Sequence, residues 1–175
     1  MKTNVTKQTI GSLFLGAMLL AAPGARGGAE VVATKVDETV KEALDTARVP
    51  YKNDAEGNFL LHLKFKNGRA QNIVIHSKVV QLGTEDDGDD LREIYSVAFV
   101  SDSPPSAELA SRLLMENGSM KIGGWVVRKN GARYEVGFRA MVPAEICEDA
   151  LLPSSEFVAT HADALENALT GKDEK

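Results

Sequence analysis

The chain has 175 residues, a formal net charge of −5 and 43% apolar residues, which is enough for one domain with a single core. The negative charge argues against nucleic acid or an anionic membrane surface as the main partner, because both select a basic protein surface. A single cysteine cannot form an internal disulfide, so the core must supply the stability.

Residues 1–29 have the layout of a secretory signal peptide. Lys2 and Lys7 precede the uncharged run IGSLFLGAMLLAAP, which is shorter than the roughly 20 apolar residues that a membrane span needs. Small residues follow, and cleavage after Gly27 or after Ala29 fits them equally. Cleavage would remove three basic residues and leave a formal charge of −8. We therefore expect an exported protein of the periplasm or the extracellular space, with no membrane attachment after cleavage.

Residues 30–171 are expected to form one domain, followed by a charged tail, 172–175, that frays. Between Thr34 and Arg48 apolar residues recur three and four positions apart, while acidic residues and a lysine fall elsewhere. This spacing predicts an amphipathic helix with Thr34 as its cap.

Two ranges of alternating apolar residues, 59–65 and 70–80, predict strands joined by a turn at Gly68. A three-residue loop with Gly68 in the left-handed conformation sets Leu61 opposite Ile73 and keeps the apolar residues on one face. A two-residue loop would mix the two faces. The pattern therefore predicts the bulged, three-residue loop.

The middle of the chain predicts a loop, a strand and a helix. Residues 81–90 (QLGTEDDGDD) are rich in Gly and acidic residues and predict an exposed loop. Residues 91–100 carry apolar side chains on both faces, which is typical of a strand at the centre of a sheet. Ser106 is placed to cap a helix that ends at Asn117, with Gly118 as its left-handed C-terminal cap.

A second hairpin is predicted to turn at Gly131. A two-residue turn there sets Val127 opposite Tyr134 and Trp125 opposite Val136. Trp125 and Tyr134 are residue types that often anchor a partner. Their alternation in phase with apolar neighbours favours a place in the core instead. The inward-facing residues would be Trp125, Val127, Tyr134, Val136, Phe138 and Ala140.

The last part of the chain predicts two helices. Pro143 would open the first and Pro153 would end it, while Ser154 or Ser155 would cap the second, which ends at Gly171. Together the elements predict a single α+β domain with an antiparallel sheet of about five strands, flanking helices and the order α-β-β-β-α-β-β-α.

Candidate metal ligands do not match a known motif. His62 and His76 lie on the outer face of the first predicted hairpin and His161 on a late helix, with no zinc-type spacing. The acidic loop does not fit an EF-hand, and a solvated charge run is the favoured interpretation. A looser calcium site remains an alternative, with oxygens from Glu85, Asp86, Asp87, Asp89 and Asp90.

The sequence predicts no catalytic residues and no cofactor. Cys147 is expected to be a small buried residue, with an intermolecular disulfide or a reactive thiol as alternatives. A catalytic pair with His161 would have to form across Pro153. No Gly-x-Ser-x-Gly elbow and no phosphate-binding glycine pattern is present. We therefore expect a non-enzymatic protein.

The stretches LREIYSVAFVSDSP, ELASRLLMENGSMKIGGWVV and YEVGFRAMVPAE resemble the YbjN family of bacterial sensory-transduction regulators, which has the type III secretion chaperone-like fold. The similarity runs from about Val31 to about Leu169. It implies a small α+β domain, often a homodimer, that binds other polypeptides and has no defined catalytic residues. This chain differs from secretion chaperones of that fold in carrying an export signal.

Two functions follow as expectations. The first is an exported module that binds another protein or a peptide in a helix groove or by strand addition at a sheet edge. The alternative is a sensor of a small ligand or of calcium, which would use the sheet face or the acidic loop.

Overall fold

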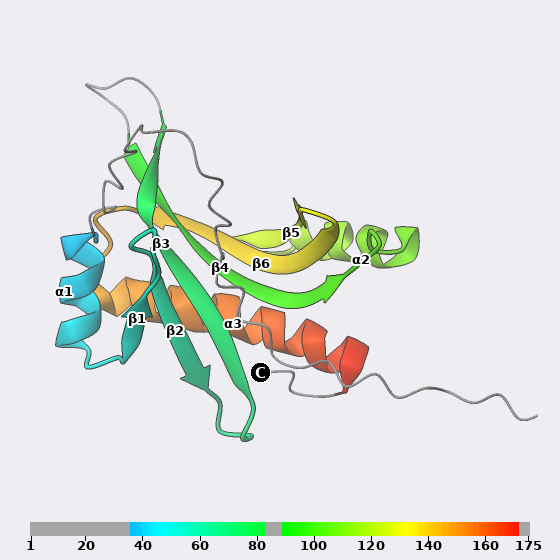
Figure 1. Cartoon of the computed structure of the whole chain (residues 1–175), viewed down its shortest axis with the longest axis horizontal. Helices are drawn as coiled ribbons and strands as arrows, with labels where there is room; N and C mark the ends of the chain where they lie inside the picture. Colours follow the sequence, from blue (N-terminus) through cyan, green and yellow to red (C-terminus); the bar gives the residue numbers. More distant parts are fainter. Residues whose placement is uncertain (1–35, 83–88, 172–175) are drawn as a thin grey trace, which may run out of the picture. The chain divides into compact units, whose positions relative to one another are not determined.

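The computed structural model describes residues 36–82 and 89–171, which form one α+β domain around a six-stranded antiparallel sheet (Figure 1). The strand order is β1-β2-β3-β4-β6-β5. The strands are β1 (Tyr51–Asn53), β2 (Phe59–Lys64), β3 (Ala70–Leu82), β4 (Asp89–Ser101), β5 (Gly124–Asn130) and β6 (Arg133–Pro143). The helices are α1 (Glu38–Thr46), α2 (Ala107–Asn117) and α3 (Glu148–Thr170). The predicted fold class is confirmed, and the short edge strand β1 brings the strands to six.

One face of the sheet, the inner face, packs against α3, which contacts β3, β4 and β6 and passes behind β3 in Figure 1. Alternation along the strands directs Ile75, Ile94 and Phe138 to this face, where they are fully buried. Leu44 from α1 and Leu113 from α2 join the same apolar core. The intervening strand residues form the opposite, outer face.

The register of the first hairpin confirms the prediction. Leu61 pairs with Ile73, and the loop between β2 and β3 is closed by a hydrogen bond from the Phe65 N–H to the Arg69 carbonyl. Gly68 has a φ of 84°, which is the left-handed conformation that the bulged loop requires.

The register of the second hairpin was predicted wrongly by two residues. Asn130 pairs with Arg133, so the turn is centred on Gly131 and Ala132, and Trp125 lies opposite Phe138. Gly131, with a φ of 61°, takes the first central position of the turn, where a type II′ turn places glycine. A slip of two residues keeps every side chain on its face, so alternation alone cannot distinguish the two registers.

Two helix caps differ from the prediction. Asp37 caps α1, because its side chain accepts a hydrogen bond from the Val40 N–H, whereas Thr34 lies outside the described residues. Ser106 caps α2 as predicted and accepts from the Leu109 N–H. Gly118 follows α2 with a right-handed φ of −63°, so the predicted left-handed cap is wrong there.

The two helices predicted at the end of the chain are one. Pro143 ends β6 instead of opening a helix, and α3 continues through Pro153. A proline inside a helix costs about 3 kcal/mol, because it removes one hydrogen bond and crowds the preceding turn. Leu151 before it and Val158 after it are both fully buried, and this packing holds the helix together. Gly171, with a φ of 63°, ends α3 as predicted.

Candidate functional site

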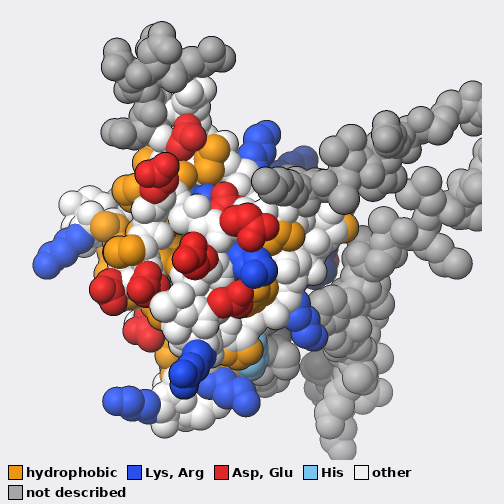
Figure 2. Space-filling model, turned by 90° about the vertical axis from the view of Figure 1, so that its left-hand side faces the viewer, with side chains coloured by type: hydrophobic (Ala, Val, Ile, Leu, Met, Phe, Trp, Pro, Cys, Tyr) orange, Lys and Arg blue, Asp and Glu red, His pale blue; other side chains and the backbone are white. Residues whose placement is uncertain are grey.

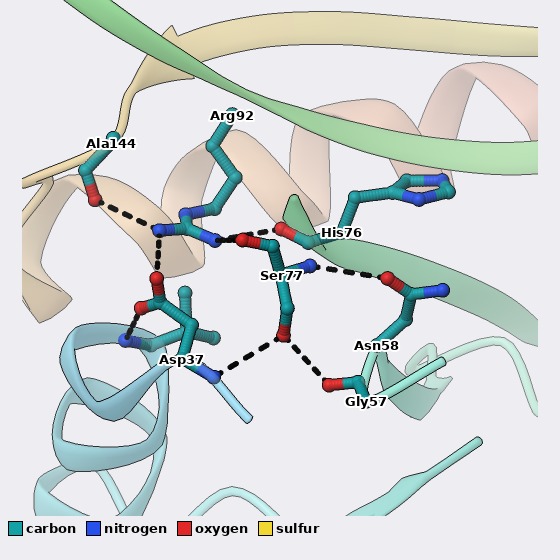
Figure 3. A network of polar contacts seen from close by, with 8 residues as sticks. Asp37, Gly57, Asn58, His76, Ser77, Arg92 and Ala144 are labelled. Carbon is teal, nitrogen blue, oxygen red and sulfur yellow. Dashed lines mark hydrogen bonds and ion pairs between the residues drawn. The ribbon is translucent and has the colours of Figure 1, made fainter. Parts of the chain in front are cut away.

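The domain contains a buried polar centre at Arg92 of β4, which is 1% exposed (Figure 3). The register between β3 and β4 shifts next to it, so the carbonyl groups of His76 and Ser77 fall within a bulge of β3. Nη1 of Arg92 donates to these two carbonyl oxygens at 2.7 and 3.1 Å. The guanidinium therefore satisfies acceptors that the sheet leaves unpaired.

The same centre ties α1 to the sheet. Nη2 of Arg92 donates to Asp37 Oδ2 at 2.6 Å, while Asp37 Oδ1 caps α1. The Ser77 N–H donates to Asn58 Oδ1 at 3.1 Å, and the Ser77 hydroxyl donates to the Gly57 carbonyl (Figure 3). Apart from the cap of α1, these bonds join protein groups from different elements, so we interpret the centre as a structural network.

A second polar group lies on the outer face, and we name it the outer polar cluster. Its residues are His76, Glu93, Tyr95, Arg128, Glu135 and Arg139. Glu93 Oε1 accepts from Arg128 Nη2 at 2.6 Å and lies 3.2 Å from His76 Nε2. Burial opposes ionisation of Glu93, but the hydrogen bonds from His76 and Arg128 outweigh it and lower the pKa of Glu93 to about 2.

The low pKa of Glu93 makes part of the stability pH-dependent. Because the folded value lies below the ordinary value of 4.5, this stabilisation is present above about pH 4.5 and is lost as the pH falls towards 2. The pKa difference alone would correspond to about 3 kcal/mol, and the remaining solvent exposure of Glu93 reduces the expected effect to about 1–2 kcal/mol. Urea unfolding of Glu93→Gln should show that loss at about pH 7 and a smaller one at about pH 3. Equal losses at both pH values would contradict this assignment.

Tyr95 lies flat on the sheet within the cluster. The guanidinium carbon of Arg128 is 4.0 Å from the centre of its ring, and the Gly137 backbone lies on the ring, since a Cβ there would be 2.5 Å from it. Tyr95 is 4% exposed, and its hydroxyl has no hydrogen-bond partner. Burial raises the pKa of Tyr95 to about 12, so the phenol stays neutral and is not a general base near neutral pH.

The cluster borders an open hollow of about 390 Å³. The turn between β1 and β2, which carries Asp54 and Glu56, lines one part of it. Val74, Tyr95 and Val97 of the sheet line another part, and His76, Arg128 and Glu135 complete the lining. The hollow therefore combines apolar side chains with charges of both signs.

The three histidines do not form a metal site. His62 and His76 lie on the outer face as predicted, but His62 Nδ1 is 2.9 Å from Asn72 Oδ1, and His76 pairs with Glu93. His161 of α3 stacks on Phe138 at the inner face, with ring centres 4.7 Å apart. The described part of the chain contains no group of three or more His, Cys, Asp or Glu residues that could hold a metal ion.

The predicted acidic loop falls partly outside the structure. Gln81 and Leu82 belong to β3, and Asp90 is an exposed residue of β4, so the loop is shorter than predicted. The remaining acidic residues of the calcium hypothesis lie outside the described residues or, for Asp89, have a side chain that is not described. These are Glu85, Asp86, Asp87 and Asp89.

The prediction that Cys147 is buried is wrong. Cys147 is exposed and precedes the first turn of α3, because the helix begins later than Pro143 would have placed it. His161 lies 14 residues further along this continuous helix, which separates the two by about 20 Å at 1.5 Å per residue. The structure therefore does not bring the thiol and the imidazole together.

Trp125 belongs to the core, and Tyr134 lies beside it. Trp125 is buried and packs edge-on against Phe138, with 5.0 Å between ring centres, while its Nε1 donates to Glu116. Tyr134 is half-buried, and Lys129 Nζ lies 5.7 Å from its ring centre. The core interpretation is confirmed for Trp125 and fits Tyr134 only in part.

β5 is an edge strand that α2 covers at one end only. The Trp125 N–H donates to Asn117 Oδ1 at 2.6 Å, and Asn117 Nδ2 donates to the Trp125 carbonyl at 3.2 Å. In an antiparallel strand the N–H and C=O of one residue point to the same side, so those of Trp125 point away from β6. The same groups of Val127 and Lys129 point to that side, and no described residue bonds them.

Large apolar side chains are exposed on α2, which contacts β5, and on β5 itself. Leu114 and Met115 of α2 are 70% and 73% exposed, and Val127 of β5 is 48% exposed. Val127 shares the inner face with Trp125, as predicted, but it is exposed there instead of buried in the core. Ile122, in the connection between α2 and β5, is also exposed. We call these four residues and the free edge of β5 the α2–β5 surface.

Figure 2 shows a different side of the domain, where acidic side chains gather over α1 and the start of α3. Exposed acidic residues of these two elements include Glu42 and Asp45 of α1 and Asp149 of α3. This surface agrees with the acidic charge of the chain and is unfavourable for nucleic acid.

Comparisons of the chain with protein-family models, curated proteins and solved structures found no match. The resemblance to the YbjN family therefore stays a prediction. Within the described residues, no helix is long and apolar enough to cross a membrane.

Proposed function

We propose that this chain is an exported, non-enzymatic module that binds an extended segment of a partner polypeptide along β5. The observation that carries the proposal is the α2–β5 surface, in which β5 has unpaired strand groups and α2, which contacts β5, has exposed apolar side chains. Export to the periplasm or the extracellular space is part of the proposal and is based on the sequence pattern of residues 1–29.

Strand addition explains why both features occur together. The N–H and C=O groups of Val127 and Lys129 offer backbone hydrogen bonds to an added strand, and each such bond contributes about 0.5–1.5 kcal/mol. The backbone groups of these two residues alone would give little affinity for a partner strand. The apolar side chains of Leu114, Met115 and Ile122 supply further surface that a partner can bury. A second copy of this chain could offer its own β5 edge, which would give the homodimer that the family resemblance implies.

A proline at position 127 tests the proposal. The Val127 N–H points away from β6, so Val127→Pro removes a donor from the free edge and leaves the β5–β6 hydrogen bonds in place. Extended peptides selected from a phage-displayed library should bind Val127→Pro at least about tenfold more weakly than the unaltered protein, as measured by fluorescence anisotropy.

The matched control is Val127→Ala, which shortens the side chain but keeps the N–H. It should bind the same peptides more strongly than Val127→Pro. Equal affinity of Val127→Pro and the unaltered protein, with both folded, would contradict strand addition. Light scattering on the same variants shows whether self-association also depends on this edge.

A further inference from the structure

The hydroxyl of Tyr95 is a buried polar group that the protein itself leaves without a partner. A phenol can donate one hydrogen bond and accept two, and nearly all buried polar atoms in folded proteins use this capacity. Tyr95 lines the hollow on the outer face, so a ligand bound there could supply the missing partner.

The charges around the hollow indicate the sign of that ligand. Asp54, Glu56 and Glu135 contribute three carboxylates to the lining, of which those of Asp54 and Glu56 also accept from the Asn58 amide, whereas Arg128 is its one guanidinium and His76 its one imidazole. Arg128 is already paired with Glu93 at 2.6 Å. This ion pair makes its guanidinium less available to an anionic ligand. Glu135 uses Oε1 to accept from Asn130, and Oε2 has no described partner. The lining therefore favours a cation.

The remaining part of the hollow is apolar. Val74, Val97 and the ring of Tyr95 face it from neighbouring strands. Binding of methylene groups to such a surface is favourable, because it removes apolar area from water. The volume of about 390 Å³ is at the small end of the range for ligand pockets, about 300–1,000 Å³.

We infer that this hollow binds an aliphatic ammonium group. The Glu135 carboxylate and the Tyr95 hydroxyl oxygen accept hydrogen bonds from the ammonium, and its methylene chain lies on Val74 and Val97. A free diamine and the lysine side chain of a polypeptide share this chemistry. The site lies on the outer face and does not depend on strand addition at β5.

The test is isothermal titration of the full mature chain with putrescine and, separately, with Nα-acetyl-lysine amide. Saturable binding of at least one of them is expected, with butanediol and succinate as the uncharged and oppositely charged controls. Glu135→Gln should weaken binding by about tenfold or more. The matched control Glu42→Gln removes the same charge from the exposed face of α1 and should leave the affinity nearly unchanged.

Tyr95→Phe distinguishes a ligand contact from a structural role. Without ligand, the variant should unfold at a higher temperature than the unaltered protein, because an unpaired buried hydroxyl is removed. The same variant should bind the ammonium probe more weakly. Tighter binding of putrescine supports a free amine, and tighter binding of the lysine derivative supports a partner's side chain. Binding of neither probe, binding of succinate instead, or affinities unchanged in both Tyr95→Phe and Glu135→Gln would overturn the inference.

Discussion

Replacement of Arg92 by methionine is expected to lower the free energy of unfolding by about 3–5 kcal/mol. The change removes the partner of Asp37 and leaves the bulge carbonyl groups of His76 and Ser77 without their donor. Each of these acceptors is then unsatisfied in the core, and the cost of such groups adds to the lost ion pair. Urea unfolding followed by circular dichroism measures the loss. The comparison holds if the unfolding free energy of both proteins depends on the urea concentration with the same slope.

Asp37→Asn is the matched control for Arg92→Met. Asparagine retains a side-chain oxygen that can cap α1, and Arg92 keeps its three backbone acceptors, so a smaller loss of about 1–2 kcal/mol is expected. If Arg92→Met instead stayed within about 1 kcal/mol of the unaltered protein, the bulge would not depend on the guanidinium.

The sequence predicts the faces of the strands better than their partners. Leu61 and Ile73 were placed opposite each other correctly, because the competing loop was one residue shorter and would have mixed the faces. The competing registers of the second hairpin differ by two residues and are equivalent in pattern. Only the turn conformation at Gly131 distinguishes them.

Tertiary packing overrides local signals elsewhere. Pro153 is a strong signal for a helix end, yet α3 remains helical across it because residues on both sides are buried in the core. Arg92 of β4 and Ser77 of β3 occupy inward positions, where apolar side chains are the rule. These two polar residues in core positions were the available signal for the bulge, but its geometry cannot be read from either residue alone.

The outer polar cluster could not be predicted for a different reason. His76, Glu93, Arg128 and Glu135 come from four strands, which become neighbours through the order β3-β4-β6-β5. Local patterning gives each strand and its faces but not this order, because the connection from β4 to β5 through α2 places β5 beyond β6. The sequence around Glu93 therefore does not predict that His76, Arg128 and Arg139 lie next to it.

Gly137→Ala is expected to destabilise the domain by about 3 kcal/mol, because there is no room for a methyl group at this point of β6. A Cβ at Gly137 would lie 2.5 Å from the Ser96 carbonyl oxygen and 2.5 Å from the Tyr95 ring. The first atom belongs to the neighbouring strand, and the ring is held from above by Arg128. Neither can move without disturbing the sheet or the outer polar cluster.

Gly131→Ala provides the comparison, since a Cβ there meets no atom within 4 Å and only the positive φ opposes it. That change should cost about 1 kcal/mol. In a Tyr95→Leu background, Gly137→Ala should cost less than in the unaltered protein but still more than Gly131→Ala, because the contact with the Ser96 carbonyl remains. A double-mutant cycle from thermal and urea unfolding measures this coupling. Additive losses would mean that the Tyr95 ring does not rest on Gly137, and the packing that positions its hydroxyl at the hollow would then be wrong.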